Sequence, residues 1–191
     1  MILPLRVFII ITIFIIIWAL FKLILSIYPF PHVTRKKWIE YIYKLSALII
    51  LSIMSIDLTV INKNLADKHS KVAILVSNHI SWIDALIYAS LFGNGYVAKE
   101  ATKHIPIVGL IGVAVQNINV SLKSRTKTTN HTSSNNSDST SDKMVQFQQD
   151  YYDETTNKDI FNQICVFPEG TTTNGVNMIS FRSGAFRGGF P

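Results

Sequence analysis

Apolar residues gather in two runs near the start of the chain. The first covers residues 7–28 and contains a single charged side chain, Lys22. Because about 20 mostly apolar residues suffice to span a bilayer as a helix, this run predicts a transmembrane helix. The second run, residues 45–56, is shorter than a span requires and predicts an interfacial or re-entrant helix, or a core helix. Residues 1–60 are therefore expected to form a membrane-anchoring segment.

The charges around the first run indicate its orientation. Arg6 is the one basic residue before the run, whereas four basic residues follow it, Arg35, Lys36, Lys37 and Lys44. By the positive-inside rule, the rest of the chain is then expected in the cytosol. A cleaved signal peptide is the alternative, but the run is longer than a signal-peptide core and no small-residue cleavage site follows it.

The remaining part, residues 61–191, alternates between short apolar runs and turns. Residues 81–91 predict a helix that begins with Ser81 as its N-cap and is followed by two glycines. Four apolar runs predict strands, at 71–77, at 96–98, within 111–120 and at 160–167. This alternation predicts an α/β fold, in which a sheet flanked by helices follows the N-terminal membrane helix.

A polar stretch interrupts this domain. Residues 123–142 consist almost wholly of Ser, Thr, Asn, Lys and Asp. Such a segment buries too little apolar surface to offset the entropy that ordering would cost. We expect a disordered insertion over 123–158, because residues 146–153 continue the polar character.

Composition narrows the kinds of partner. The mean hydropathy of +0.28 is high for a soluble domain. The net charge of +6 suits an anionic lipid surface or an anionic substrate. Outside the region that flanks the membrane segment, the sequence has no basic helix with interleaved aromatics, so nucleic acid is not an expected partner. The single cysteine, Cys165, excludes an intrachain disulfide and lies in an apolar run, which predicts a small buried side chain.

Residues 78–84 combine a histidine with an acid at the start of the predicted helix. They read Asn-His-Ile-Ser-Trp-Ile-Asp, with His79 and Asp84 five residues apart. A carboxylate bonded to one ring nitrogen fixes the imidazole tautomer and stabilises the imidazolium. The other nitrogen is then free to act as a general base. The alternative makes Asp84 a helix-capping acid and His79 a turn residue. A zinc site lacks a third ligand at suitable spacing.

A second motif makes the pattern more specific. Residues 167–171 read Phe-Pro-Glu-Gly-Thr and follow an apolar run. The Asn-His-x-Ser-x-x-Asp pattern, an HX4D motif, followed by Phe-Pro-Glu-Gly-Thr resembles the glycerophospholipid acyltransferase family, in its lysophosphatidate and lysophosphatidylcholine acyltransferase branches. Residues 171–174 and 179–186 resemble the second of these branches. The resemblance extends over residues 74–191, apart from the polar insertion.

The resemblance implies an O-acyltransferase that moves a fatty acyl group from acyl-CoA to the hydroxyl of a lysophospholipid. His79 would be the base and Asp84 its orienting partner, while Glu169, Gly170 and Thr171 would help to bind the acceptor. Neither a bound cofactor nor a metal is implied, and acyl-CoA is the co-substrate. The other partners would be the lysophospholipid and the lipid bilayer. The implied location is a membrane, that of the endoplasmic reticulum, with the catalytic part facing the cytosol.

The chain departs from the family pattern in two places. The family carries an arginine that would fall near residues 120–122, where this chain has none. Lys99 fits the segment before that position, and Lys123 or Arg125 is the nearest substitute for binding phosphate. The alternative is that both are solvated charges of the loop. The chain also stops at residue 191, where a final family block would begin, so we expect an incomplete sheet and a C-terminally truncated sequence.

These departures leave alternative functions open. A non-catalytic, membrane-anchored pseudoenzyme is the main alternative to the acyltransferase. A hydrolase that uses the same His–Asp pair is a third possibility, but the chain has no Gly-x-Ser-x-Gly nucleophile elbow.

Overall fold

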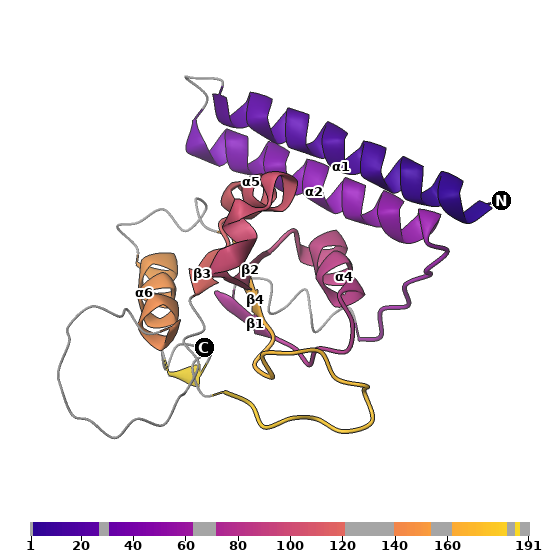
Figure 1. Ribbon diagram of the computed structural model, residues 1–191. Coiled ribbons are helices and arrows are strands. Elements are labelled where there is room, and N and C mark those ends of the chain that lie inside the picture. Colours follow the sequence, from indigo (N-terminus) through magenta and orange to yellow (C-terminus); the bar gives the residue numbers. More distant parts are fainter. Residues whose placement is uncertain are drawn as a thin grey trace.

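Two long helices lie side by side at the N-terminal end of the fold (Figure 1). The computed structural model describes residues 2–26, 31–62, 72–120, 140–153, 162–182 and 186–187. Helix α1 spans Ile2–Ser26 and helix α2 spans His32–Ile53. Within the described residues, Leu3–Ser26 is the one helix long and apolar enough to cross a membrane. The helix expected over 7–28 therefore begins earlier, and residues 27 and 28 lie outside the described part.

Helix α2 differs from the prediction for residues 45–56. These residues do not form a separate short helix, because most of them are the second half of α2. The helix begins after Pro31, whose carbonyl accepts a hydrogen bond from the Arg35 N–H at 3.1 Å. The prediction of a short helix was wrong because it followed the uninterrupted apolar run alone. The buried positions recur at helical spacing from the polar half onward, at Ile39, Ser46, Ala47, Ile50 and Leu51.

Four short parallel strands form the centre of the molecule. They are β1 (Ile74–Val76), β2 (Gly95–Lys99), β3 (Ile118–Val120) and β4 (Ile164–Val166), in the spatial order β1-β4-β2-β3. Each expected strand region overlaps one of them, and the predicted α/β class is confirmed. The run 111–120 forms a strand only at its end, because its first part belongs to a helix. Since all pairs are parallel, the residues that follow the strands meet at one edge of the sheet.

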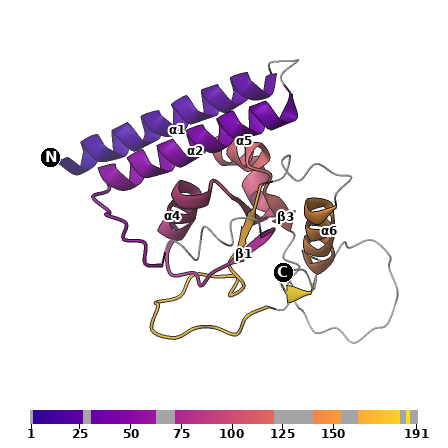
Figure 2. The ribbon, with the colours of Figure 1, turned by 180° about the vertical axis from the view of Figure 1, so that it is seen from behind.

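Helices cover both faces of this sheet (Figure 2). Helix α4 (Ile83–Phe92) lies on the face to which Tyr96 points, because the Tyr96 hydroxyl donates to the carbonyl of Ala85. Helix α5 (Pro106–Ala114) packs through Ile111 and Ala114 against the α1–α2 pair. The layers therefore run from the N-terminal pair, through α4 and α5, to the sheet.

Helix α6 covers the other face and corrects the predicted disorder. It spans Thr140–Tyr152, inside the insertion that was expected to be disordered over 123–158. Its buried residues Met144, Phe147 and Tyr151 pack against Ile164 and Val166 of β4. An apolar stripe at helical spacing is thus enough to order a segment whose overall composition is polar. Residues 121–139 and 154–161 lie outside the described residues.

Candidate active site

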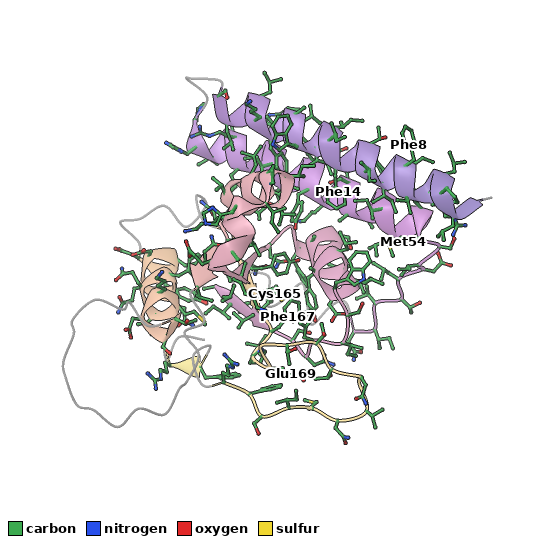
Figure 3. The ribbon with its side chains drawn as sticks, viewed as in Figure 1. Phe8, Phe14, Met54, Cys165, Phe167 and Glu169 are labelled. Atoms are coloured by element: carbon green, nitrogen blue, oxygen red, sulfur yellow. The ribbon has the colours of Figure 1, made fainter. Side chains whose placement is uncertain are left out.

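The sheet brings the two sequence motifs together. Strand β1 leads to His79, and its neighbour β4 leads to Glu169. The His79 N–H donates to Glu169 Oε1 at 2.9 Å, and the His79 carbonyl accepts from the Thr173 N–H at 2.8 Å. Figure 3 shows Cys165, Phe167 and Glu169 in sequence along β4 and the turn that follows it. The backbone of His79 is therefore held on both sides by the segment after β4.

His79 and Asp84 form a direct pair. His79 Nδ1 lies 3.0 Å from Asp84 Oδ2, with the two side chains 19% and 18% exposed. Because an ionised carboxylate only accepts hydrogen bonds, Nδ1 is the donor and carries the proton. In the described part of the chain, Nε2 makes no hydrogen bond. It is the atom of the pair that remains available to take a proton.

Asp84 also holds the turn that precedes α4. The same oxygen, Oδ2, accepts the backbone N–H groups of Ile80 at 2.7 Å and Ser81 at 2.9 Å. Asp84 is therefore bonded both to His79 and to the turn before α4, whose N-cap is Trp82 and not the expected Ser81. The catalytic role of the pair stays a prediction. The helix start fixes the carboxylate, and the fixed carboxylate in turn orients the imidazole.

Aromatic side chains fix the plane of the imidazole. The His79 ring stacks on Phe167 with ring centroids 4.1 Å apart and an interplanar angle of 13°. Tyr88 of α4 meets Phe167 edge-on and donates its hydroxyl proton to Ser77 Oγ at 2.7 Å. In the sequence, Phe167 stands out only as the first residue of the Phe-Pro-Glu-Gly-Thr motif. The contact joins adjacent strands, and neither residue's local sequence predicts it.

Glu169 is a buried structural link. Its side chain is 3% exposed, and Oε2 accepts the N–H of Ile179 at 3.3 Å while Oε1 accepts that of His79. Gly170 follows with φ of +72°, in the left-handed region that favours glycine. Gly170 and Thr171 are exposed beside this link. Their expected contact with the acceptor stays a prediction.

Of the cations that were expected to bind phosphate, Lys99 lies in the described part of the chain. Lys99 ends β2, which lies on the opposite side of β4 from β1, and its side chain is exposed. Arg125 and Lys123 lie outside the described residues. Sequence reasoning missed Arg182, whose N–H donates to the carbonyl of Pro168 at 3.0 Å. Arg182 belongs to residues 179–186, which the sequence singles out only through the family resemblance. The spacing between Arg182 and Glu169 does not predict that they share a turn.

A groove adjoins the pair along α4. It has a volume of about 350 Å³ and is bordered by Asp84 and Tyr88. Most of its wall is apolar, formed by Ile80, Ile87, Leu91 and Phe92. Its size falls at the lower end of the range for small-molecule sites.

Cys165 is not part of this chemistry. Its side chain is fully buried, as the sequence predicted. Burial, and to a smaller degree the negative charge of Asp84, raises the pKa of the Cys165 thiol to about 12. The thiol therefore stays protonated near neutral pH. Among the described residues, no cluster of three or more His, Cys, Asp or Glu side chains is suited to hold a metal ion.

Comparison with known proteins agrees with this geometry. The sequence model of the family described as Acyltransferase matches residues 57–188. The chain is 35% identical over 118 residues to lysophospholipid acyltransferase LPEAT2 from Arabidopsis thaliana, which covers 62% of this chain and 19% of that protein. It is 24% identical over 180 residues to the lyso-ornithine lipid O-acyltransferase of Brucella abortus, covering 92% of this chain and 59% of that protein.

A third relative is the lysophosphatidylcholine acyltransferase of Drosophila melanogaster. It is 28% identical over 118 residues, which cover 62% of this chain and 19% of that protein. The chain thus spans about a fifth of the length of two of these relatives. No solved structure matches the chain significantly. The family match covers most of the chain and both motifs, and the chain therefore belongs to the acyltransferase family, in its glycerophospholipid acyltransferase group.

Proposed function

We propose that this protein transfers a fatty acyl group from acyl-CoA to the free hydroxyl of a lysophospholipid. The observation that carries the proposal is the pair of His79 and Asp84, joined at 3.0 Å beside the Glu169 turn. The pair leaves Nε2 available as a base, and the acceptor brings its own hydroxyl nucleophile. The names of the relatives support a lysolipid as the acceptor.

The proposed reaction needs one base and one orienting acid. Nε2 of His79 takes the proton of the acceptor hydroxyl as its oxygen attacks the thioester carbonyl carbon. Asp84 stabilises the imidazolium that forms, because its carboxylate accepts the Nδ1–H. The tetrahedral intermediate then loses the sulfur of CoA as the C–S bond breaks. His79 returns its proton to that sulfur, so the products are the acylated lipid and the CoA thiol.

The surroundings of the pair suit lipid substrates. The apolar groove along α4 would accommodate part of an acyl chain next to Asp84. Helix α1 exposes many apolar side chains, among them Leu3 at 73% and Phe8 at 68%. We assign α1 to the bilayer, with the membrane of the endoplasmic reticulum and a cytosolic site as the proposed location. Anchoring of this kind would place the site where lysophospholipids are found.

Among acceptors, lysophosphatidylcholine and related lysolipids rank ahead of lysophosphatidate and glycerol 3-phosphate. The preference rests on residues 171–174 and 179–186, which resemble the lysophosphatidylcholine acyltransferase branch. One of these residues, Ile179, donates its N–H to Glu169 and so lies next to the site.

An acceptor panel tests the proposal. Membranes that contain the chain, from a host whose own lysophospholipid acyltransferases are inactivated, would be given labelled acyl-CoA with each acceptor in turn. We expect labelled diacyl phospholipid from lysophosphatidylcholine and related lysolipids, and less from lysophosphatidate or glycerol 3-phosphate. No labelled lipid with any acceptor would indicate a non-catalytic protein. Label released solely as free fatty acid would indicate a hydrolase.

A further inference from the structure

An arginine without an assigned role lies against the turn that holds His79. A Cβ atom built on Gly170 would lie 3.0 Å from both Cζ and Nε of Arg182, and 3.2 Å from Nη2. The guanidinium therefore packs on the bare face of Gly170, the residue directly after Glu169. The Arg182 N–H also donates to the carbonyl of Pro168 at 3.0 Å, which ties the backbone of the arginine to the same turn.

Among the described residues, Arg182 forms no ion pair with Glu169, the acid of the same turn. Both oxygens of Glu169 accept backbone N–H groups, from His79 at 2.9 Å and from Ile179 at 3.3 Å. In the part of the chain that the structure describes, the Arg182 guanidinium forms no ion pair, and the residue is exposed. An exposed guanidinium with free donors, fixed at a buried turn, is suited to bind an anion.

The order of the strands places the Arg182 turn beside the strand that leads to His79, and this does not hold for Lys99. Glu169 follows β4, whose neighbour β1 leads to His79. Lys99 ends β2, which is two strand positions from β1, or about 10 Å at the usual spacing. Arg182 thus lies against the turn that contacts His79, whereas Lys99 lies on a strand that does not pair with β1.

From this geometry we infer that Arg182 binds the phosphate of the lysophospholipid acceptor and so places the acceptor hydroxyl at Nε2 of His79. The inference rests on the proposed function, because it concerns the acceptor of that reaction. A guanidinium donates two parallel hydrogen bonds to a phosphate, which fixes the direction of the acceptor as well as its distance. Acceptors with a phosphate are therefore preferred over a monoacylglycerol with the same acyl chain and hydroxyl.

Equilibrium binding without acyl-CoA tests this inference separately from catalysis. The ligands are a short-chain lysophosphatidylcholine and the monoacylglycerol of the same chain, both below their micelle concentrations. Arg182→Gln is expected to weaken binding of the lysophospholipid by about 10- to 100-fold, since a hydrogen bond to a charged group is lost, and to leave the monoacylglycerol unchanged. Arg182→Lys should give an intermediate loss. Arg187→Gln, the same loss of charge nearby in the sequence, should have no effect.

Several outcomes would overturn the inference. Unchanged lysophospholipid binding by Arg182→Gln would do so, as would equal losses for the two ligands, which would indicate a structural role. Binding of a non-hydrolysable acyl-CoA analogue provides the third arm, and a loss there in place of the lysophospholipid would assign Arg182 to the phosphates of the donor. If the wild-type chain binds lysophospholipid through Arg182 but transfers no acyl group to it, the inference stands and the proposed function fails.

Discussion

At the scale of single residues, Glu169 joins parts of the site that are far apart in sequence. Its carboxylate accepts one N–H from His79, after β1, and one from Ile179, in the loop after β4. Glu169 is almost fully buried, so its carboxylate has little contact with water. Glu169 therefore holds the His79 turn and the loop that contains Ile179 in one arrangement.

This role predicts a cost for the substitution Glu169→Gln. A glutamine offers one acceptor oxygen and one NH₂ group, and the NH₂ group would face a backbone N–H. Leaving a buried donor unsatisfied costs about 1–3 kcal/mol, so we expect the free energy of unfolding to fall by about that amount. Thermal or denaturant unfolding in detergent measures the change. Glu100→Gln is the matched control, because Glu100 is exposed and pairs with Lys103 on the surface; equal effects of both substitutions would contradict the role.

The contact between His79 and Asp84 could be predicted from the sequence, because their spacing places an acid at a helix start beside a turn. The catalytic role of the pair stays a prediction. The stacking of Phe167 on His79 and the approach of Arg182 to Gly170 were not predicted. Both contacts depend on which strands become neighbours, and the apolar runs do not encode that order.

At the scale of secondary-structure elements, α6 shows how a polar segment joins the core. Polar residues dominate its surroundings in sequence, and this composition led to the prediction of disorder. Its apolar residues nevertheless recur at intervals of three and four, so they form one stripe against β4. The overall composition of a segment does not show this periodicity. The prediction of disorder was wrong because it relied on the composition alone. The short apolar runs did indicate the regions of the strands, although most of the run 111–120 belongs to α5 and only its end is β3.

The packing of α6 predicts that Phe147→Ala destabilises the protein. Phe147 is buried between α6 and the sheet, and removal of a buried phenylalanine side chain typically costs about 3 kcal/mol or more. We expect a lower unfolding temperature for this variant. Gln149→Ala, at an exposed position of the same helix, is expected to unfold like wild type. Wild-type stability of Phe147→Ala would mean that α6 is not part of the core.

At the scale of the whole molecule, the α1–α2 pair presents an apolar surface on the side away from the sheet. Ile17 and Phe21 of α1 are buried against the rest of the fold, while Ile11 and Ile15 are each 51% exposed. On α2, Leu45, Leu48 and Ile49 are also exposed. An apolar surface of this kind marks an interaction with a membrane or another protein. We assign it to the bilayer, in accord with the hydropathy of α1.

This assignment predicts the effect of charges on the exposed side of α1. The double substitution Ile11→Asp with Ile15→Asp should release a large fraction of the protein from membranes, because an aspartate near the bilayer centre costs about 3 kcal/mol. Flotation with liposomes measures the bound fraction. The corresponding double alanine variant keeps the surface apolar and is expected to float with the liposomes. Equal flotation of the aspartate and alanine variants would place lipid contact elsewhere.

The central claim is that His79, held by Asp84, is the base that activates the acceptor hydroxyl. The most direct test is the initial rate of acyl transfer to lysophosphatidylcholine by His79→Ala, with His104→Ala as a control. His104 is an exposed histidine of the short helix η1 (Glu100–His104). We expect His79→Ala to lose at least about 100-fold in rate, the usual contribution of a general base, and His104→Ala to keep the wild-type rate. If His79→Ala folds and transfers acyl groups as fast as wild type, His79 is not the base.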